Sequence, residues 1–69
     1  MMCKRYMLIA FTNGTGTRHM TDRYPIDAVK DIYNKEPDII SVEVYKYIKE
    51  RRDYKYICTI SIERGLCDD

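Results

Sequence analysis

The sequence predicts a small α+β domain of 69 residues, in which one helix packs on one face of an antiparallel sheet with the element order ββαββ. Three observations lead to this fold class. An apolar run over residues 6–11 is followed by Asn13-Gly14, which is a strong hairpin signal. Residues 25–35 carry an apolar stripe at helical spacing. Residues 39–63 hold two runs of alternating character around a short charged connection, as in a second hairpin.

The first strand is expected over Arg5–Thr12. Residues 6–11 are all apolar, and an unbroken apolar run is typical of a strand that is covered on both faces. After the turn, Thr17–Thr21 is expected to return as a short polar edge strand. The alternative is a long irregular loop at this position, which would give the order βαββ.

The helix is expected over Pro25–Lys35. Pro25 suits the first helical turn, and Asp27 complements the positive end of the helix dipole. Glu36-Pro37-Asp38 then ends the helix. The predicted stripe that faces the sheet consists of Ile26, Ala28, Val29, Ile32 and Tyr33.

The second hairpin is expected to join strands over residues 39–49 and 54–63, with residues 64–69 as a frayed tail. Its strands repeat one phrase, Tyr-Lys-Tyr-Ile, at Tyr45–Ile48 and at Tyr54–Ile57. A turn of three or five residues would place the apolar residues of both strands on one face. This register predicts that the tyrosines of the second copy point toward the helix, as core residues, and that those of the first copy point away. The predicted apolar face consists of Ile40, Val42, Val44, Ile48, Tyr54, Tyr56, Cys58, Ile60 and Ile62.

Charge and cysteine content narrow the function classes. Twelve basic and eleven acidic residues give a net charge of +1, which argues against a strongly basic nucleic-acid binder and against an acidic DNA mimic. Cys3, Cys58 and Cys67 are odd in number and widely spaced, so neither a zinc site nor a disulfide framework is expected. The sequence shows no secretory signal and no apolar segment of membrane-spanning length, and a cytoplasmic location is expected.

No catalytic or cofactor-binding pattern is found. Residues 13–19 resemble a phosphate-binding loop superficially, but the helix begins well after Gly16, so a hairpin turn is favoured. His19 has no predicted catalytic partner and is expected to be exposed. Cys58 lies on the predicted apolar face and is expected to be an inert core thiol. We therefore expect no catalytic residue, no metal and no cofactor, and we predict that the protein is not an enzyme.

The tyrosine-rich hairpin points to binding instead. One helix cannot cover both faces of a sheet, and an exposed aromatic and aliphatic face usually marks an interaction site. The first strand adds either Tyr6, Leu8 and Ala10 or Met7, Ile9 and Phe11 to the uncovered face. We predict a non-catalytic module that binds another protein, or a second copy of itself as a homodimer, through this face and a basic hairpin tip. The predicted partner-binding residues are Tyr45, Tyr47, Lys49, Arg51, Arg52, Lys55 and Ile57.

In size and composition the chain is similar to phage and mobile-element accessory proteins, which often block a host enzyme stoichiometrically, as anti-CRISPR proteins do. This similarity is one of general style, because no motif carries it. The alternative function is single-stranded nucleic-acid binding, with Tyr45 and Tyr47 stacking on bases and the basic tip contacting phosphates.

Overall fold

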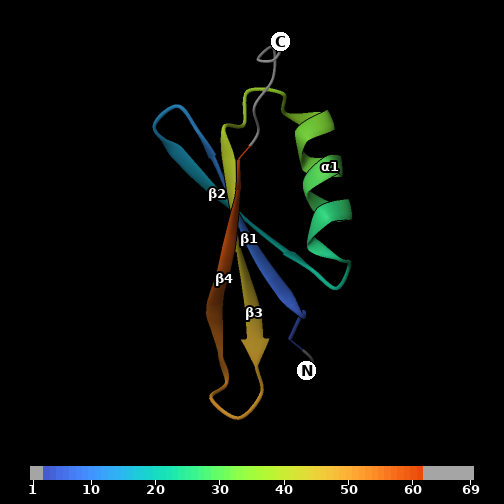
Figure 1. The fold of residues 1–69 in the computed structure, drawn as a ribbon, viewed down its shortest axis with the longest axis vertical. Helices are drawn as coiled ribbons and strands as arrows, with labels where there is room; N and C mark the ends of the chain where they lie inside the picture. Colours follow the sequence, from blue (N-terminus) through green and yellow to red (C-terminus); the bar gives the residue numbers. More distant parts are fainter. Residues whose placement is uncertain (1–2, 62–69) are drawn as a thin grey trace.

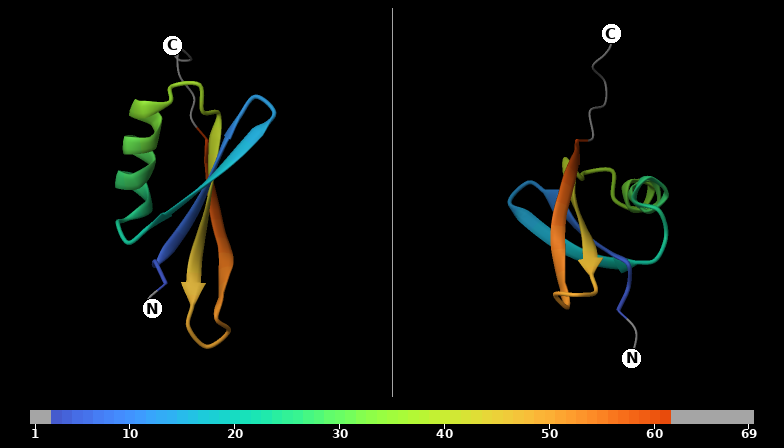
Figure 2. Two further views of the ribbon diagram at one scale, coloured as in Figure 1. Left: turned by 180° about the vertical axis from the view of Figure 1, so that it is seen from behind. Right: turned by 60° about the horizontal axis from the view of Figure 1, so that its bottom comes forward.

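A computed structural model describes residues 3–61 and confirms the ββαββ order (Figure 1). The helix is α1 (Pro25–Lys35), and the strands are β1 (Tyr6–Thr12), β2 (Thr15–Thr21), β3 (Ser41–Ile48) and β4 (Asp53–Ser61). The strands form one antiparallel sheet in the order β2-β1-β3-β4, and α1 lies on one face of it (Figure 2). The sequence predictions for Ile62, for the end of the last strand and for the tail at 64–69 fall outside the described residues.

The hairpin of β1 and β2 has a two-residue turn. Thr12 pairs with Thr15, and Asn13-Gly14 lies between them. Gly14 has a φ of 88°, a left-handed value that glycine adopts without the clash that a Cβ atom causes. The strand that was predicted to start at Thr17 therefore starts at Thr15, and the alternative of a long loop is wrong.

Helix α1 begins and ends at the predicted residues. Ala28 and Val29 are buried against the sheet, and Ile32 packs beside them. Ile26 was predicted on the same stripe but is 55% exposed. Successive residues of a helix are about 100° apart around its axis, so Ile26 lies roughly 100° from the common direction of Ala28, Val29 and Ile32. It therefore points to the side of the helix and away from the sheet.

The core lies between α1 and the two inner strands of the sheet. Its fully buried side chains come from β1, from β3 and from the loop before β3. The sequence predicted Ile40 on the core face, but Ile40 is exposed and its neighbour Ile39 is buried. Ile40 precedes the strand, and its backbone N–H donates to the carbonyl of Phe11 at 2.8 Å. The buried residues are Leu8, Ala10, Ala28, Val29, Ile39, Val42 and Val44.

The hairpin of β3 and β4 combines a turn of even length with a β-bulge. Ile48 pairs with Asp53 across a four-residue turn, so the turn has neither of the odd lengths that the sequence predicted. The register shifts after Tyr45, and Ile57 is the extra residue on β4. Beyond the bulge, Val44 pairs with Cys58, as predicted. The predicted register is therefore confirmed from Val44 and Cys58 to the far end of the hairpin. Between the bulge and the turn it is wrong.

The even turn reverses the expected direction of two tyrosines. Tyr45 pairs with Tyr56, and Tyr47 pairs with Tyr54. Residues directly opposite in an antiparallel pair share one face of the sheet. Tyr45 and Tyr47 alternate with the buried Val44, so they point away from the helix, and their partners on β4 do the same. The prediction that Tyr54 and Tyr56 point toward the helix is therefore wrong.

Replacement of Leu8 by alanine tests the position of the core. Leu8 is 0% exposed, so Leu8→Ala is expected to reduce the free energy of unfolding by about 3 kcal/mol, because it removes buried methyl groups and leaves a cavity. Urea denaturation followed by circular dichroism measures this change. Ile26→Ala is the matched control and should cost less than about 1 kcal/mol. Equal losses in the two variants would contradict the described core.

A candidate binding surface on the open sheet face

The face of the sheet opposite α1, called here the outer face, carries apolar side chains along β1. Met7, Ile9 and Phe11 alternate with the buried Leu8 and Ala10, so they lie on the outer face, where they are half-buried. The structure thus decides which of the two predicted sets from the first strand lies on this face. The expectation that this strand is covered on both faces is not met within the chain, because α1 covers one face only (Figure 2).

The four tyrosines of the repeated phrase gather on the outer face and form what we call the tyrosine cluster. The rings of Tyr45 and Tyr56 meet edge to face, with centroids 5.7 Å apart. The rings of Tyr47 and Tyr54 are tilted, with centroids 5.2 Å apart. Both arrangements are favoured for aromatic pairs because the ring edge is positive and the ring face is negative. The cluster is partly accessible, and Tyr56 is the most open member, at 50% exposure.

Hydrogen bonds fix the phenol groups of the pair nearer the middle of the sheet. The hydroxyl of Tyr45 donates to Oε1 of Glu43 at 3.0 Å. The hydroxyl of Tyr56 lies 2.6 Å from Oγ1 of Thr59. The hydrogen bond to Glu43 and, to a smaller extent, burial of the ring both raise the pKa of Tyr45 above its ordinary value of 10.0. These contacts hold two rings in place within the chain itself.

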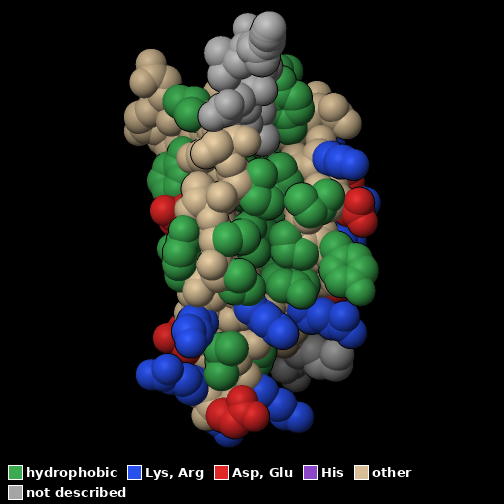
Figure 3. All heavy atoms as spheres, viewed as in Figure 1, with side chains coloured by type: hydrophobic (Ala, Val, Ile, Leu, Met, Phe, Trp, Pro, Cys, Tyr) green, Lys and Arg blue, Asp and Glu red, His purple; other side chains and the backbone are tan. Residues whose placement is uncertain are grey.

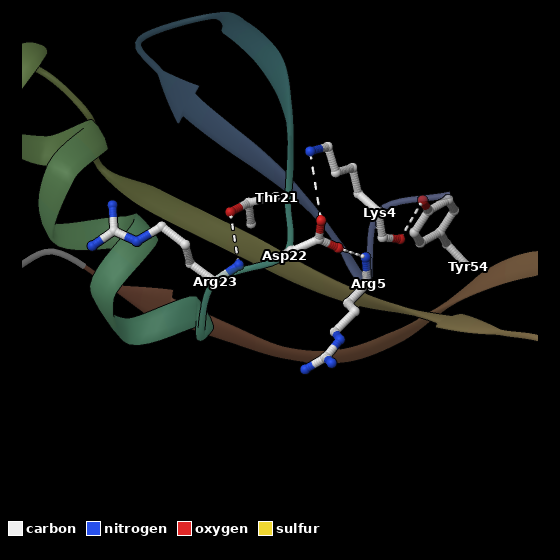
Figure 4. A network of polar contacts seen from close by, with 6 residues as sticks. All are labelled: Lys4, Arg5, Thr21, Asp22, Arg23 and Tyr54. Atoms are coloured by element: carbon white, nitrogen blue, oxygen red, sulfur yellow. Dashed lines mark hydrogen bonds and ion pairs between the residues drawn. The ribbon is translucent and has the colours of Figure 1, made fainter. Parts of the chain in front are cut away.

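Residues 4 and 5 tie the other tyrosine pair to the end of β2 (Figure 4). The hydroxyl of Tyr54 donates to the carbonyl of Lys4 at 2.8 Å. The N–H of Tyr47 donates to the carbonyl of Arg5, and the N–H of Arg5 donates to Oδ1 of Asp22 at 2.9 Å. The ammonium group of Lys4 lies 3.5 Å from Oδ2 of Asp22. One carboxylate therefore anchors the segment on which both rings depend.

Three pKa values are shifted at this end of the sheet. The N–H of Arg5 holds the pKa of Asp22 below its ordinary value of 3.8, with a smaller contribution from the charge of Lys4. The side chain of Cys3 contacts Tyr47 and, together with burial, raises the pKa of that tyrosine above 10.0. Burial raises the pKa of Tyr54 in the same direction.

A basic turn lies at the end of the hairpin beside the tyrosine cluster. Its cations Lys49, Arg51 and Arg52 are exposed, and Lys and Arg side chains gather at this end of the molecule, with a few acidic ones among them (Figure 3). Arg52 has a φ of 52°, a left-handed value that costs a residue with a side chain about 1 kcal/mol or more. A shallow hollow of about 300 Å³ adjoins the turn. It is lined by Ile48, Arg51, Asp53, Tyr54, Lys55 and Tyr56.

The other two predicted partner-binding residues lie on the edge strand β4. Lys55 pairs with Lys46, which alternates with Val44, so both lysines lie on the helix side of the sheet, although Lys55 also borders the shallow hollow that Tyr54 and Tyr56 line. Ile57 is the bulge residue of the edge strand and is 49% exposed. The outer face thus unites Tyr45 and Tyr47 with the basic turn and adds the two tyrosines that the sequence had assigned to the core.

Other predicted positions are corrected. Cys58 shares the face of Val44 but is exposed, because β4 is an edge strand beyond the cover of α1. His19 lies half-buried on β2 rather than exposed, and its Nε2 atom is buried without a hydrogen-bond partner. It borders a hollow of about 400 Å³ between β2 and α1. Among residues 3–61, no group of three or more potential ligands is placed to hold a metal ion.

Several outer-face residues were not singled out from the sequence. Arg18 and Met20 lie on this face because they pair with Ile9 and Met7. Glu43 pairs with Ile9 from the other side. β2 is mostly polar, so its sequence gives little indication of which side chains point to the outer face. The pairing with β1 is what assigns them to that face.

Comparison with known protein families, curated proteins and solved structures finds no match to this chain. Within the described residues, no helix has the length and apolar character needed to cross a membrane. The functional assignment therefore depends on the surface of the chain itself.

Replacement of Asp22 by asparagine tests the anchor of the cluster. The folded-state pKa of Asp22 is lowered, so its contribution to stability is present above the unfolded value of 3.8 and is lost as the pH falls through the folded value. The wild type should therefore lose stability more steeply than Asp22→Asn below about pH 4, and the two should converge in acid. Urea midpoints measured across this pH range provide the test, and parallel curves would contradict it.

Replacement of Tyr45 by phenylalanine tests the bond to Glu43. The raised pKa means that the neutral phenol stabilises the fold fully below pH 10.0 and that this contribution disappears as the pH rises further. Tyr45→Phe should remove one late-ionising group from the ultraviolet titration of the tyrosines. If the titration of the variant loses an early-ionising group instead, the hydrogen bond does not form.

Proposed function

We propose that the protein is a non-catalytic binding module that holds another protein through the tyrosine cluster and the basic turn at residues 49–52. It acts by occupying the surface of that protein, as accessory proteins that block host enzymes do. The observation that supports this proposal is the gathering of all four tyrosines of the repeated phrase on the sheet face that α1 leaves open.

The cluster has the properties of a protein-binding surface. Tyrosine and arginine are enriched among the residues that contribute most to binding energy. The rings of Tyr45 and Tyr54 are already held by hydrogen bonds to Glu43 and Lys4, so binding would immobilise few side chains that are free beforehand. A partner with a shallow apolar surface and an acidic rim would match the rings and the neighbouring cations.

A nucleic-acid ligand is disfavoured by the charges around the cluster. Glu43 places a carboxylate on the outer face beside Tyr45, where a phosphate backbone would be repelled. Lys46 and Lys55 lie on the opposite face of the sheet. Within residues 3–61, the residues with cationic side chains next to the rings are those of the turn together with Lys4 and Arg5, whereas single-strand binders line a whole groove with cations.

Affinity capture with a paired set of variants tests the proposal. Tyr47→Ala/Tyr56→Ala removes one ring from each aromatic pair and keeps the hydroxyl bonds of the other two tyrosines. The matched control is Tyr24→Ala, which removes a tyrosine that is 74% exposed outside the cluster. The double variant should lose the protein that wild type captures from the native host, with a drop in affinity of at least about tenfold for the purified pair, and the control should retain it.

The readout must be a one-to-one complex formed from purified components, with circular dichroism showing that each variant is folded. Salt titration separates the alternative, since a nucleic-acid ligand would dissociate steeply as salt rises and a mainly apolar protein contact would not. A folded double variant that binds the captured protein as well as wild type would contradict the proposed surface.

A further inference from the structure

The part of the outer face away from the hairpin tip is ordered in three rows that run across the strands. Strand pairing aligns one residue from each of β2, β1 and β3 in every row. The first row is Met20, Met7 and Tyr45, the second is Arg18, Ile9 and Glu43, and the third is Gly16, Phe11 and Ser41. The middle residue of every row is apolar and comes from β1, so β1 forms an apolar ridge along the centre of the rows.

The second row carries two opposite charges that do not meet within the chain. Arg18 and Glu43 flank Ile9 on neighbouring strands, which places them two strand spacings, or about 10 Å, apart. In the described part of the chain, neither side chain forms an ion pair, and Glu43 accepts the hydroxyl of Tyr45. Each charge therefore remains available to a group above the face.

A two-fold axis along β1 matches every row with itself. Such an axis lays the ridge of one copy on the ridge of the other and exchanges β2 with β3. Arg18 of each copy then lies over Glu43 of the other, and Met20 lies over the ring of Tyr45, a sulfur–aromatic contact. The small residues Gly16 and Ser41 also meet, beside the ring of Phe11. An axis across the strands would instead set Arg18 over Arg18, which is unfavourable.

The geometry points to a homodimer in which two copies pack their outer faces together about this axis, with Arg18 paired to Glu43 across the interface. The sheets would lie about 10 Å apart, as in a β-sandwich, and the arginine side chain can reach the carboxylate across that gap. β1 then becomes a strand covered on both faces, as its unbroken apolar sequence predicts.

The dimer covers Tyr45 but leaves the rest of the proposed protein-binding surface on β4 and the basic turn open. Since β1 lies on β1, the edge strand β4 of each copy extends past the overlap and carries Tyr54 and Tyr56 with it. An axis parallel to the strands keeps their direction, so both basic turns point to the same end. The dimer is thus bivalent for the partner, and its existence does not depend on the partner.

Charge reversal in both directions tests the dimer. Each copy contributes the nine residues of the three rows, whereas a standard interface has about 20–30 residues a side. The dimer should therefore be weak and should form in a concentration-dependent way. Sedimentation velocity in reducing buffer measures its formation. Arg18→Glu and Glu43→Arg should each weaken self-association by at least about tenfold, because each creates two like-charge contacts. Mixing the two variants should restore dimers, since one copy then offers two acids and the other two bases.

Lys46→Glu, a reversal of an exposed charge on the helix side, is the matched control and should dimerise as wild type does. Arg18 is exposed, so its variant should fold even if that of Glu43 does not. A wild type that stays monomeric at every concentration, an Arg18→Glu variant that dimerises as well as wild type, or a mixture of the two folded variants that stays monomeric would overturn the inference. Capture of the partner by the monomeric Arg18→Glu variant would show that the tyrosine surface acts separately.

Discussion

Among residues 3–61, the packing of α1 over the inner strands buries a core of seven apolar side chains. The helix has eleven residues and covers only one face of the sheet. A domain of this size buries only about 60% of the surface of its unfolded chain, so much apolar surface must remain accessible. The accessible apolar residues of this chain form one continuous face of the sheet rather than isolated positions. A continuous face of this kind points to an interaction site.

The arrangement of that face depends on two features of the second hairpin that offset each other. The four-residue turn pairs tyrosine with tyrosine, and the extra residue Ile57 then shifts the register so that valine and isoleucine pair correctly farther along. A hairpin without the bulge could pair the tyrosines with each other or pair the core residues with each other, but not both. With the bulge, the core residues Val42 and Val44 and the tyrosine cluster occupy opposite faces of the same two strands.

Most of the fold could be predicted from the sequence because its signals are local. The Asn13-Gly14 turn and the bounds of α1 depend on neighbouring residues, and both were found where predicted. The direction of Tyr54 and Tyr56 could not be predicted, since a bulge leaves the pattern of a strand almost unchanged while it reverses the facing of every residue beyond it. The exposure of Cys58 depends on strand order, which alternation does not reveal.

The bulge has a further consequence for edge-to-edge association of the sheet. β4 is rich in tyrosine and β-branched residues, and as an edge strand it presents unpaired backbone groups that could recruit identical strands into a growing fibre. Ile57 interrupts the regular spacing of those groups, and the neighbouring Lys55 places a charge that two stacked edges would have to bring together. Edge-to-edge growth has no natural end, whereas packing of two faces about a two-fold axis closes after two copies. The residue that restores the core register beyond the four-residue turn thus also disfavours growth from the edge of the sheet.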